Sequence, residues 1–150
     1  MNKKITFKEL RETDLPEVKN IYDYYVLNST ATFHTEPITF DELKEFIYFS
    51  HPKYKSFLIF YEGGVCGYCY ATYYKKRQAY NRTAEVTIYL KNGFTGKGIG
   101  QTALQYLEKA VKESGIKVLL AVIAGDNDAS IRAFEKAGYT GCALFKNVGE

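Results

Sequence analysis

The spacing of hydrophobic residues changes along the chain, and each change predicts a secondary-structure element. Residues 5–10 mix β-branched and aromatic positions, which is typical of a strand. After Thr13 and Asp14, apolar residues recur with the period of a helix, so a first helix is expected there. The apolar positions of this helix are Leu15, Val18, Ile21, Tyr22, Tyr25 and Val26.

A capping box predicts where a second helix begins. Thr39 and Glu42 form the T-x-x-E pattern, in which each side chain bonds to the other residue's backbone N–H. Ile38 and Leu43 are spaced to form a hydrophobic staple around the same helix start. We therefore expect a helix over residues 40–49.

Three strands are predicted in the middle of the chain. Residues 56–61 and 65–74 are rich in aromatic and β-branched side chains, and the Glu-Gly-Gly turn at 62–64 joins them into a hairpin. Residues 84–91 alternate strictly, so their strand has two different faces. One face consists of Val86, Ile88 and Leu90, and the other of Glu85, Thr87 and Tyr89.

The rest of the chain alternates helices and strands. A glycine-rich turn over 93–100 leads into a helix that ends at Gly115. The apolar run at 117–124 predicts a strand covered on both faces, followed by a short helix at 126–137 and a last strand at 139–145. The apolar positions of the long helix are Ile99, Ala103, Leu104, Leu107, Ala110 and Val111. This order of elements predicts an α/β (α+β) fold with a mixed sheet flanked by helices.

Composition narrows the class of protein. The chain has 150 residues, 46% of them hydrophobic and 25% charged, which fits one globular domain over residues 1–150. Lys and Arg number 20 against 17 Asp and Glu, and a net charge of only +3 makes a nucleic-acid partner unexpected. With no membrane-length apolar run, no signal-peptide pattern and an odd number of cysteines, we expect a cytoplasmic protein without a membrane partner.

The glycine-rich turn is the most informative segment for function. A strand ends, glycines allow close backbone approach, and a helix begins, so backbone N–H groups could hold a diphosphate. The P-loop pattern fails because Gly98 follows Lys97, and a dinucleotide fingerprint lacks its third glycine at Ala103. A glycine turn that binds no ligand remains an alternative.

Two further groupings of residues are interpreted as structural. Cys66 and Cys69 have C-x-x-C spacing, but residues three apart on a strand should face opposite sides, so we expect small core residues. His34 and His51 are the only histidines and are far apart in the sequence, so we expect neither a nucleophile triad nor a metal site.

Several motifs together point to one family. Residues 95–100 match the pattern Q/R-x-x-G-x-G/A apart from its first position, and further motifs lie at 28–37, 79–90 and 127–139. These segments resemble the GNAT acetyltransferase superfamily, specifically its phosphinothricin/methionine sulfoximine N-acetyltransferase branch, collinearly from residue 5 to residue 149. The resemblance implies the GNAT fold, a mixed and mostly antiparallel sheet flanked by about four helices.

The same resemblance implies acetyl-CoA as cosubstrate and no metal. Backbone groups of Ile88, Tyr89 and Leu90 would pair with the pantetheine amides, and Asn127 would contact the pantetheine arm. The residues whose N–H groups would hold the pyrophosphate are Gly96, Lys97, Gly98, Ile99, Gly100 and Gln101.

Three features depart from the family pattern. Thr95 stands where the signature has Gln or Arg, which removes a side-chain donor near the pyrophosphate. Phe134 stands where many members have the tyrosine that protonates the leaving thiolate, so water or the product ammonium is expected to supply that proton. Relatives continue past the position of Glu150 into another strand, so we expect a longer chain or a neighbouring subunit at that sheet edge.

The acceptor site is expected around Glu85. On the face opposite Val86, this carboxylate could remove a proton from the substrate ammonium, directly or through one water; the alternative is an ion pair with an arginine. The basic, aromatic stretch at 73–83 predicts an acceptor pocket, unless it is an ordinary solvated loop. The pocket residues would be Arg77 for an anionic group, Tyr80 and Thr83 as hydroxyl donors, and Phe33 as an apolar wall.

The expected protein is therefore an acetyl-CoA-dependent N-acetyltransferase. It would acetylate the α-amine of a small amino acid or analogue, of the phosphinothricin, methionine sulfoximine or methionine sulfone type, by direct transfer. The resemblance also implies a homodimer. The alternatives are another acceptor amine (a peptide N-terminus, an amino sugar or a polyamine) or a catalytically silent acyl-CoA-binding module.

Overall fold

A computed structural model of the chain describes residues 4–28, 39–73, 83–91, 93–94, 98–121, 134–136 and 139. Its strands are β1 (Ile5–Glu9), β2 (Ser56–Tyr61), β3 (Gly64–Tyr73), β4 (Thr83–Leu90) and β5 (Val118–Leu120). Its helices are the 3₁₀ turn η1 (Glu12–Asp14), α1 (Leu15–Asn28), α2 (Phe40–Leu43) and α3 (Ile99–Glu113). Each of these elements overlaps a predicted element of the same type, η1 forming the predicted start of the first helix.

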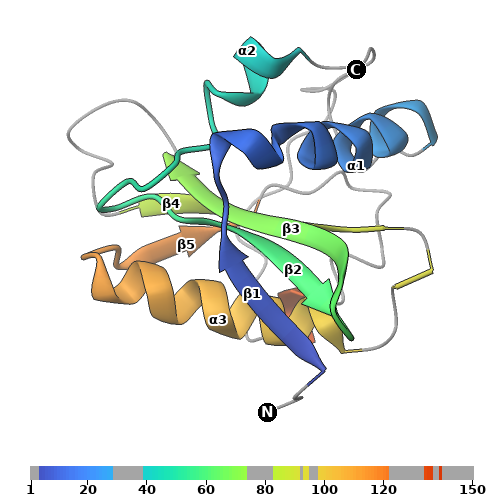
Figure 1. Ribbon diagram of the computed structural model, residues 1–150. Helices are drawn as coiled ribbons and strands as arrows, with labels where there is room; N and C mark the ends of the chain where they lie inside the picture. Colours follow the sequence, from blue (N-terminus) through green and yellow to red (C-terminus); the bar gives the residue numbers. More distant parts are fainter. Residues whose placement is uncertain are drawn as a thin grey trace, which may run out of the picture.

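The five strands form one mixed sheet in the order β1-β2-β3-β4-β5. Neighbouring strands are antiparallel except β4 and β5, which are parallel. Helix α3 lies on one face of the sheet, and α1 and α2 lie on the other (Figure 1). The predicted mixed, mostly antiparallel sheet with helices on both sides is confirmed.

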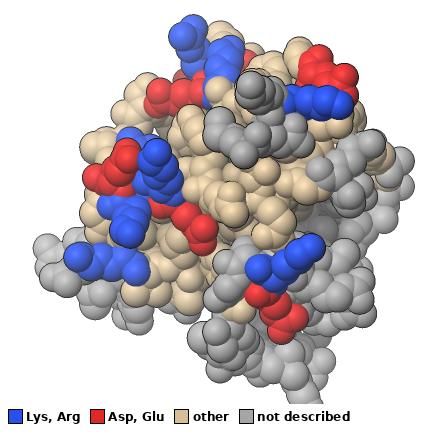
Figure 2. Space-filling view, turned by 90° about the horizontal axis from the view of Figure 1, so that it is seen from below, with Lys and Arg blue, Asp and Glu red and all other residues tan. Residues whose placement is uncertain are grey.

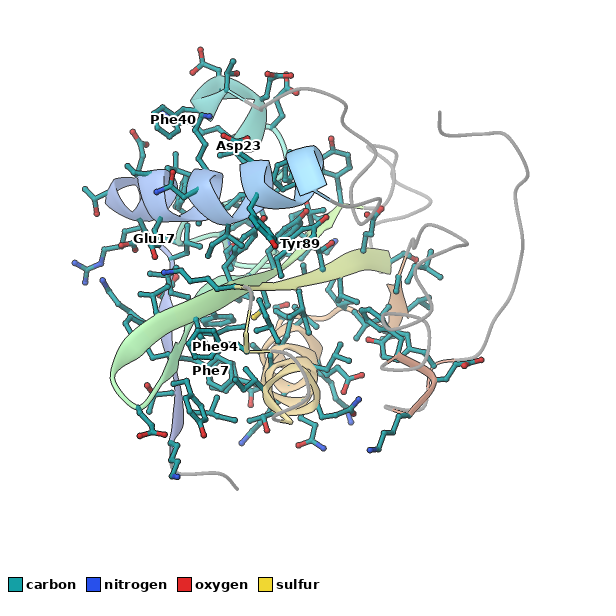
Figure 3. The ribbon with its side chains drawn as sticks, turned by 90° about the vertical axis from the view of Figure 1, so that its right-hand side faces the viewer. Phe7, Glu17, Asp23, Phe40, Tyr89 and Phe94 are labelled. Atoms are coloured by element: carbon teal, nitrogen blue, oxygen red, sulfur yellow. The ribbon has the colours of Figure 1, made fainter. Side chains whose placement is uncertain are left out.

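Two hydrophobic cores follow from this layering. On the α3 side, buried Val86 packs with Ile99 and Leu107, and Ile88 and Leu90 border the same core. On the α1 side, the core contains residues of α1, α2 and the sheet, with Tyr89 at its border. The strict alternation of residues 84–91 therefore predicted the two faces of β4 correctly. Figure 3 shows Tyr89 on the side of α1, with Phe7 and Phe94 on the side of α3.

Helix α2 is shorter than predicted. The capping box is confirmed, since the Glu42 N–H donates to Thr39 Oγ1 at 3.2 Å and the Thr39 N–H donates to Glu42 Oε1 at 3.0 Å. The helix nevertheless ends at Leu43 instead of continuing to residue 49. After Lys44 and Glu45, residues 46–49 are aromatic or β-branched. They turn toward the sheet, where Phe46 contacts the Tyr70 ring and Ile47 is buried. Tertiary packing of these side chains outweighs continuation of the helix.

Strand β5 is shorter and more exposed than predicted. The apolar run at 117–124 predicted a strand covered on both faces, but the described strand is Val118–Leu120, and Val118 is 47% exposed. Within the described residues, β5 pairs with β4 at three positions and is not covered on both faces, whereas residues 122–124 of the predicted strand lie outside the described residues. Within the predicted helix at 126–137, residues 134–136 are described and helical. Of the predicted strand at 139–145, the structure describes Tyr139 and no residue beyond it, and the staple residue Ile38 lies outside the described residues.

A β-bulge corrects the expected orientation of the cysteines. Ile59 pairs with Gly67 but Phe60 pairs with Val65, so Cys66 is an extra residue in β3. The bulge shifts the alternation by one position, and Cys66 and Cys69 both lie in the core on the α3 side instead of on opposite faces. Their interpretation as small core residues is confirmed, since both are buried, and burial raises the pKa of both thiols.

Next to the bulge, β3 lies unusually close to β4 at Gly67. A Cβ there would overlap the Tyr89 carbonyl oxygen and would lie 3.0 Å from Leu90 Cα. Gly67→Ala should therefore lower the free energy of unfolding by about 3 kcal/mol, because backbone of β4 must move. Gly64→Ala is the matched control, since its nearest neighbour would be 3.9 Å away. Urea denaturation measures both, and equal stabilities of the two variants would contradict this account.

Candidate active site

Strand β4 runs on past the end of its pairing with β5. The parallel pairing joins Thr83–Glu85 to Val118–Leu120, whereas the antiparallel pairing with β3 continues to Leu90. The segment Ile88–Leu90 thus lies between the last β5 pair and the glycine turn. This is the stretch of β4 in which backbone pairing with a ligand was predicted.

The end of β4 is held by contacts to helix α1 and to the neighbouring strand β3. Lys91 Nζ lies 2.5 Å from Glu17 Oε1 of α1, and the Lys91 N–H donates to the Cys66 carbonyl at 2.7 Å. The chain then turns, with the Phe94 N–H donating to the Lys91 carbonyl and Gly93 at a φ of 92°. These contacts fix where the glycine turn leaves the sheet.

Helix α3 begins at the glycine turn with its N-terminus open. Gly98 precedes the helix with a φ of 77°, a left-handed conformation that favours glycine. The Thr102 N–H donates to the Gly98 carbonyl, so the amides of Ile99 and Gly100 precede the first helical hydrogen bond. A Cβ at Gly98 or Gly100 would meet no atom within 4 Å. An anion could therefore approach this backbone closely.

The face of β4 toward α1 carries a group of polar side chains. Glu85 is half-buried on this face and pairs in register with Thr72 of β3, while Thr87 pairs with Tyr70. A hydrogen bond joins the hydroxyls of Tyr70 and Thr87. Directly paired residues of neighbouring strands share a face. The register therefore collects a carboxylate and three hydroxyl groups on one side of the sheet.

Tyr70 is the largest side chain of this polar group and is almost fully buried. Only 6% of its surface is exposed, and its ring stacks on Tyr68 and contacts Phe46. Burial raises the pKa of Tyr70 well above its ordinary value, the nearby Glu85 carboxylate raises it further, and the Thr87 hydrogen bond acts in the opposite direction. Tyr70 therefore keeps its proton beside Glu85 across the physiological pH range.

The predicted site residues divide into two sets. Those that the structure describes line β4 and the start of α3: Thr83, Glu85, Ile88, Tyr89, Leu90, Gly98, Ile99, Gly100 and Gln101. Glu85 and Thr83 share one face of β4 by alternation. The other predicted residues lie outside the described residues: Phe33, Arg77, Tyr80, Gly96, Lys97 and Asn127.

Sequence reasoning missed the β3 side of the polar group. Tyr70 and Thr72 belong to a strand that was interpreted only as half of a hairpin. Their relevance depends on the register between β3 and β4, which places Thr72 opposite Glu85. The alternating pattern of β3 could have signalled a polar face, but the bulge at Cys66 interrupts that pattern.

Other candidate groups have structural roles. His51 Nδ1 accepts hydrogen bonds from the N–H groups of Lys53 and Tyr54, both at 3.0 Å, and thereby shapes the loop before β2. Phe134 packs beside the core on the α3 side and contacts the Tyr139 ring. Within the described ranges, no cluster of His, Cys, Asp and Glu could hold a metal ion.

Two general features of the described residues are the charge on the surface and the character of the helices. On the face seen in Figure 2, Lys and Arg side chains lie next to Asp and Glu side chains around a largely uncharged centre. Among the described helices, none is long and apolar enough to cross a membrane.

A comparison of the sequence with models of known protein families identifies the family of this chain. The model of the Acetyltransferase (GNAT) family matches residues 18–139, which include β4, the glycine turn and α3. The chain belongs to the GNAT acetyltransferase family. The resemblance predicted from the sequence motifs is thereby confirmed, and the chain is an acetyltransferase.

Individual GNAT relatives cover most of the chain. A phosphinothricin N-acetyltransferase from Streptomyces viridochromogenes is 34% identical over 91% of this chain and 74% of the relative. An L-methionine sulfoximine/L-methionine sulfone acetyltransferase from Pseudomonas aeruginosa is 27% identical over 91% of this chain and 81% of the relative. The crystal structure of a phosphinothricin acetyltransferase from Sinorhizobium meliloti in complex with acetyl-CoA has a TM-score of 0.87 and 30% identity, covering 97% of this chain and 80% of that one.

Proposed function

We propose that this GNAT acetyltransferase transfers the acetyl group of acetyl-CoA to the α-amine of a small amino acid or amino-acid analogue. The observation that carries the proposal is the position of Glu85 on β4, the strand that leads through the glycine turn to the N-terminus of α3. The named relatives act on phosphinothricin and on methionine sulfoximine or sulfone, which supports the same class of acceptor.

The start of α3 fits the diphosphate of acetyl-CoA. Backbone amides at Ile99 and Gly100 precede the helical ladder, and the helix dipole favours negative charge at this end. The space around Gly98 and Gly100 permits close approach. The segment Ile88–Leu90 would hold the pantetheine arm. The remaining proposed contacts come from Gly96, Lys97, Gln101 and Asn127.

Glu85 is proposed as the general base. Acetyl-CoA supplies an activated acetyl group, whose carbon bonds to the amine nitrogen as the carbon–sulfur bond breaks. The nitrogen attacks only when neutral, so the acceptor ammonium must first lose a proton. Glu85 takes that proton directly or through one water. Tyr70 and Thr87 lie on the same face as the carboxylate, and their hydroxyls keep their protons. Glu85 is therefore the group in this cluster that can accept the proton.

The acceptor side chain would be recognised by the residues between β3 and β4. Arg77 is proposed to bind the α-carboxylate or the anionic end, because its planar fork matches paired oxygens. Tyr80 and Thr83 would add hydroxyl groups, and Phe33 would form an apolar wall. A homodimer, implied by the family resemblance, completes the proposal, and light scattering of the purified protein tests it.

A thiol-release assay with a panel of amines tests the proposed function. Phosphinothricin, methionine sulfoximine and methionine sulfone should give kcat/KM values at least about tenfold above spermidine, glucosamine and a peptide N-terminus, since buried polar groups discriminate strongly. A highest value with one of the latter amines would overturn the acceptor class. Binding of acetyl-CoA without thiol release from any amine would instead support a silent binding module.

A further inference from the structure

Thr72 carries a buried hydroxyl that has no hydrogen-bond partner. The residue is 5% exposed, and its Oγ1 has no hydrogen-bond partner in the part of the chain that the structure describes. A buried polar atom without a partner typically costs about 1–3 kcal/mol. Such an atom in the middle of a sheet therefore calls for an explanation.

The sheet register places this hydroxyl beside the proposed base. Thr72 of β3 is the direct partner of Glu85 of β4, and both side chains lie on the face toward α1. Directly opposed residues have Cβ atoms about 4.5–5.5 Å apart. The Thr72 hydroxyl and the Glu85 carboxylate can thus reach the same small group from two sides.

The hydroxyl groups of Thr87 and Ser56 do not share this property. Thr87, two residues after Glu85 and on the same face of β4, hydrogen-bonds to Tyr70. Ser56, buried in β2, donates through Oγ to the Tyr48 carbonyl at 3.0 Å. Each of these hydroxyls has a structural partner, whereas that of Thr72 has none. Thr72 thus differs from Thr87 and Ser56, and it is the residue that pairs directly with Glu85.

We propose that Thr72 is an acceptor-positioning residue, whose hydroxyl accepts a hydrogen bond from the acceptor amine and holds the nitrogen next to Glu85. This inference rests on the proposed function and adds to it a contact on β3. An acceptor ammonium has three N–H groups. When Glu85 takes one proton, a second N–H remains bonded to Thr72 Oγ1, and the nitrogen lone pair is left to attack.

Thr72→Val tests the proposal because valine keeps the shape and removes only the hydroxyl. We expect kcat/KM for the acceptor to fall roughly 10- to 100-fold, as for loss of a hydrogen bond to a charged group. The loss should be expressed mainly in the KM of the acceptor, with the KM of acetyl-CoA unchanged. Thr72→Ser restores the hydroxyl and should return activity to within about threefold of wild type.

Stability separates this role from a structural one. Removing an unpartnered buried hydroxyl should raise the melting temperature of Thr72→Val, by about 3 °C or more for a chain of this size. The matched control is Thr87→Val, which breaks the bond to Tyr70 and should lower the melting temperature. A lower melting temperature for Thr72→Val would show that its hydroxyl serves the fold and would overturn the proposal.

Kinetics decide the remaining outcomes. An acceptor KM of Thr72→Val within twofold of wild type, or equal losses in Thr72→Val and Thr72→Ser, would also overturn the positioning role. Failure of the proposed function would look different, because Glu85→Gln would then keep full activity or no amine in the panel would be acetylated. Loss of activity in Glu85→Gln together with an unchanged Thr72→Val would reject only the role of Thr72.

Discussion

Glu85→Gln should lower kcat/KM for the acceptor by roughly 10²–10⁴-fold, the usual contribution of a general base. Glutamine retains the size of the side chain and a carbonyl acceptor but takes no proton at neutral pH. The half-buried position on β4, next to Thr72 and Tyr70, should be preserved by the variant. Binding of acetyl-CoA, measured by titration calorimetry, should therefore remain unchanged.

Two measurements distinguish loss of a base from general damage. Raising the pH into the range where the acceptor amine is already neutral should recover part of the lost activity, because a base is then less needed. Glu62→Gln is the matched control: it removes a carboxylate from an exposed turn, whose only described ion pair, with Lys4, spans 3.9 Å. An activity within twofold of wild type in Glu85→Gln would remove this residue from the mechanism. The structural alternative, an ion pair with an arginine, predicts that the loss of activity follows a loss of stability.

Gly98→Val should weaken acetyl-CoA binding by at least about 100-fold, equivalent to about 2.7 kcal/mol. The φ of Gly98 is 77°, which a β-branched residue rarely adopts, so the turn must change its backbone conformation. The valine side chain would also occupy the open space through which a phosphate approaches the amides of Ile99 and Gly100. Both effects act on the same end of α3.

Gly115→Val provides a control matched for strain. Gly115 lies just beyond the other end of α3 with a φ of 95°, and a Cβ there also meets no atom within 4 Å. Both variants should lose stability to a similar degree in urea denaturation, but only Gly98→Val should lose acetyl-CoA binding. Normal binding by Gly98→Val, or equal loss in both variants, would refute the role of the glycine turn. Gly100→Ala, which has no positive φ, tests close approach without backbone strain.

Local patterns predicted the described elements because the interactions that form them are local. The helical spacing that starts at Leu15 and the glycine at 115 depend on neighbours within a few residues. The alternation of β4 likewise predicted which side chains face α3 and which face α1, and Val86 and Tyr89 confirm it. The predictions that were wrong involve contacts between distant segments. Helix α2 ends early because Phe46 packs on Tyr70, and the cysteines share a face because of a bulge opposite β2.

The candidate site divides in the same way. Glu85, the glycine turn and the family signature lie within one continuous segment, so the sequence by itself determined the family and predicted where acetyl-CoA would bind. Thr72 and Tyr70 contribute only through pairing of β3 with β4, and no local pattern specifies that register once a bulge intervenes. The sequence therefore determined which groups are available, and the tertiary structure decided which of them meet, because cross-strand contacts depend on register and packing rather than on neighbouring residues.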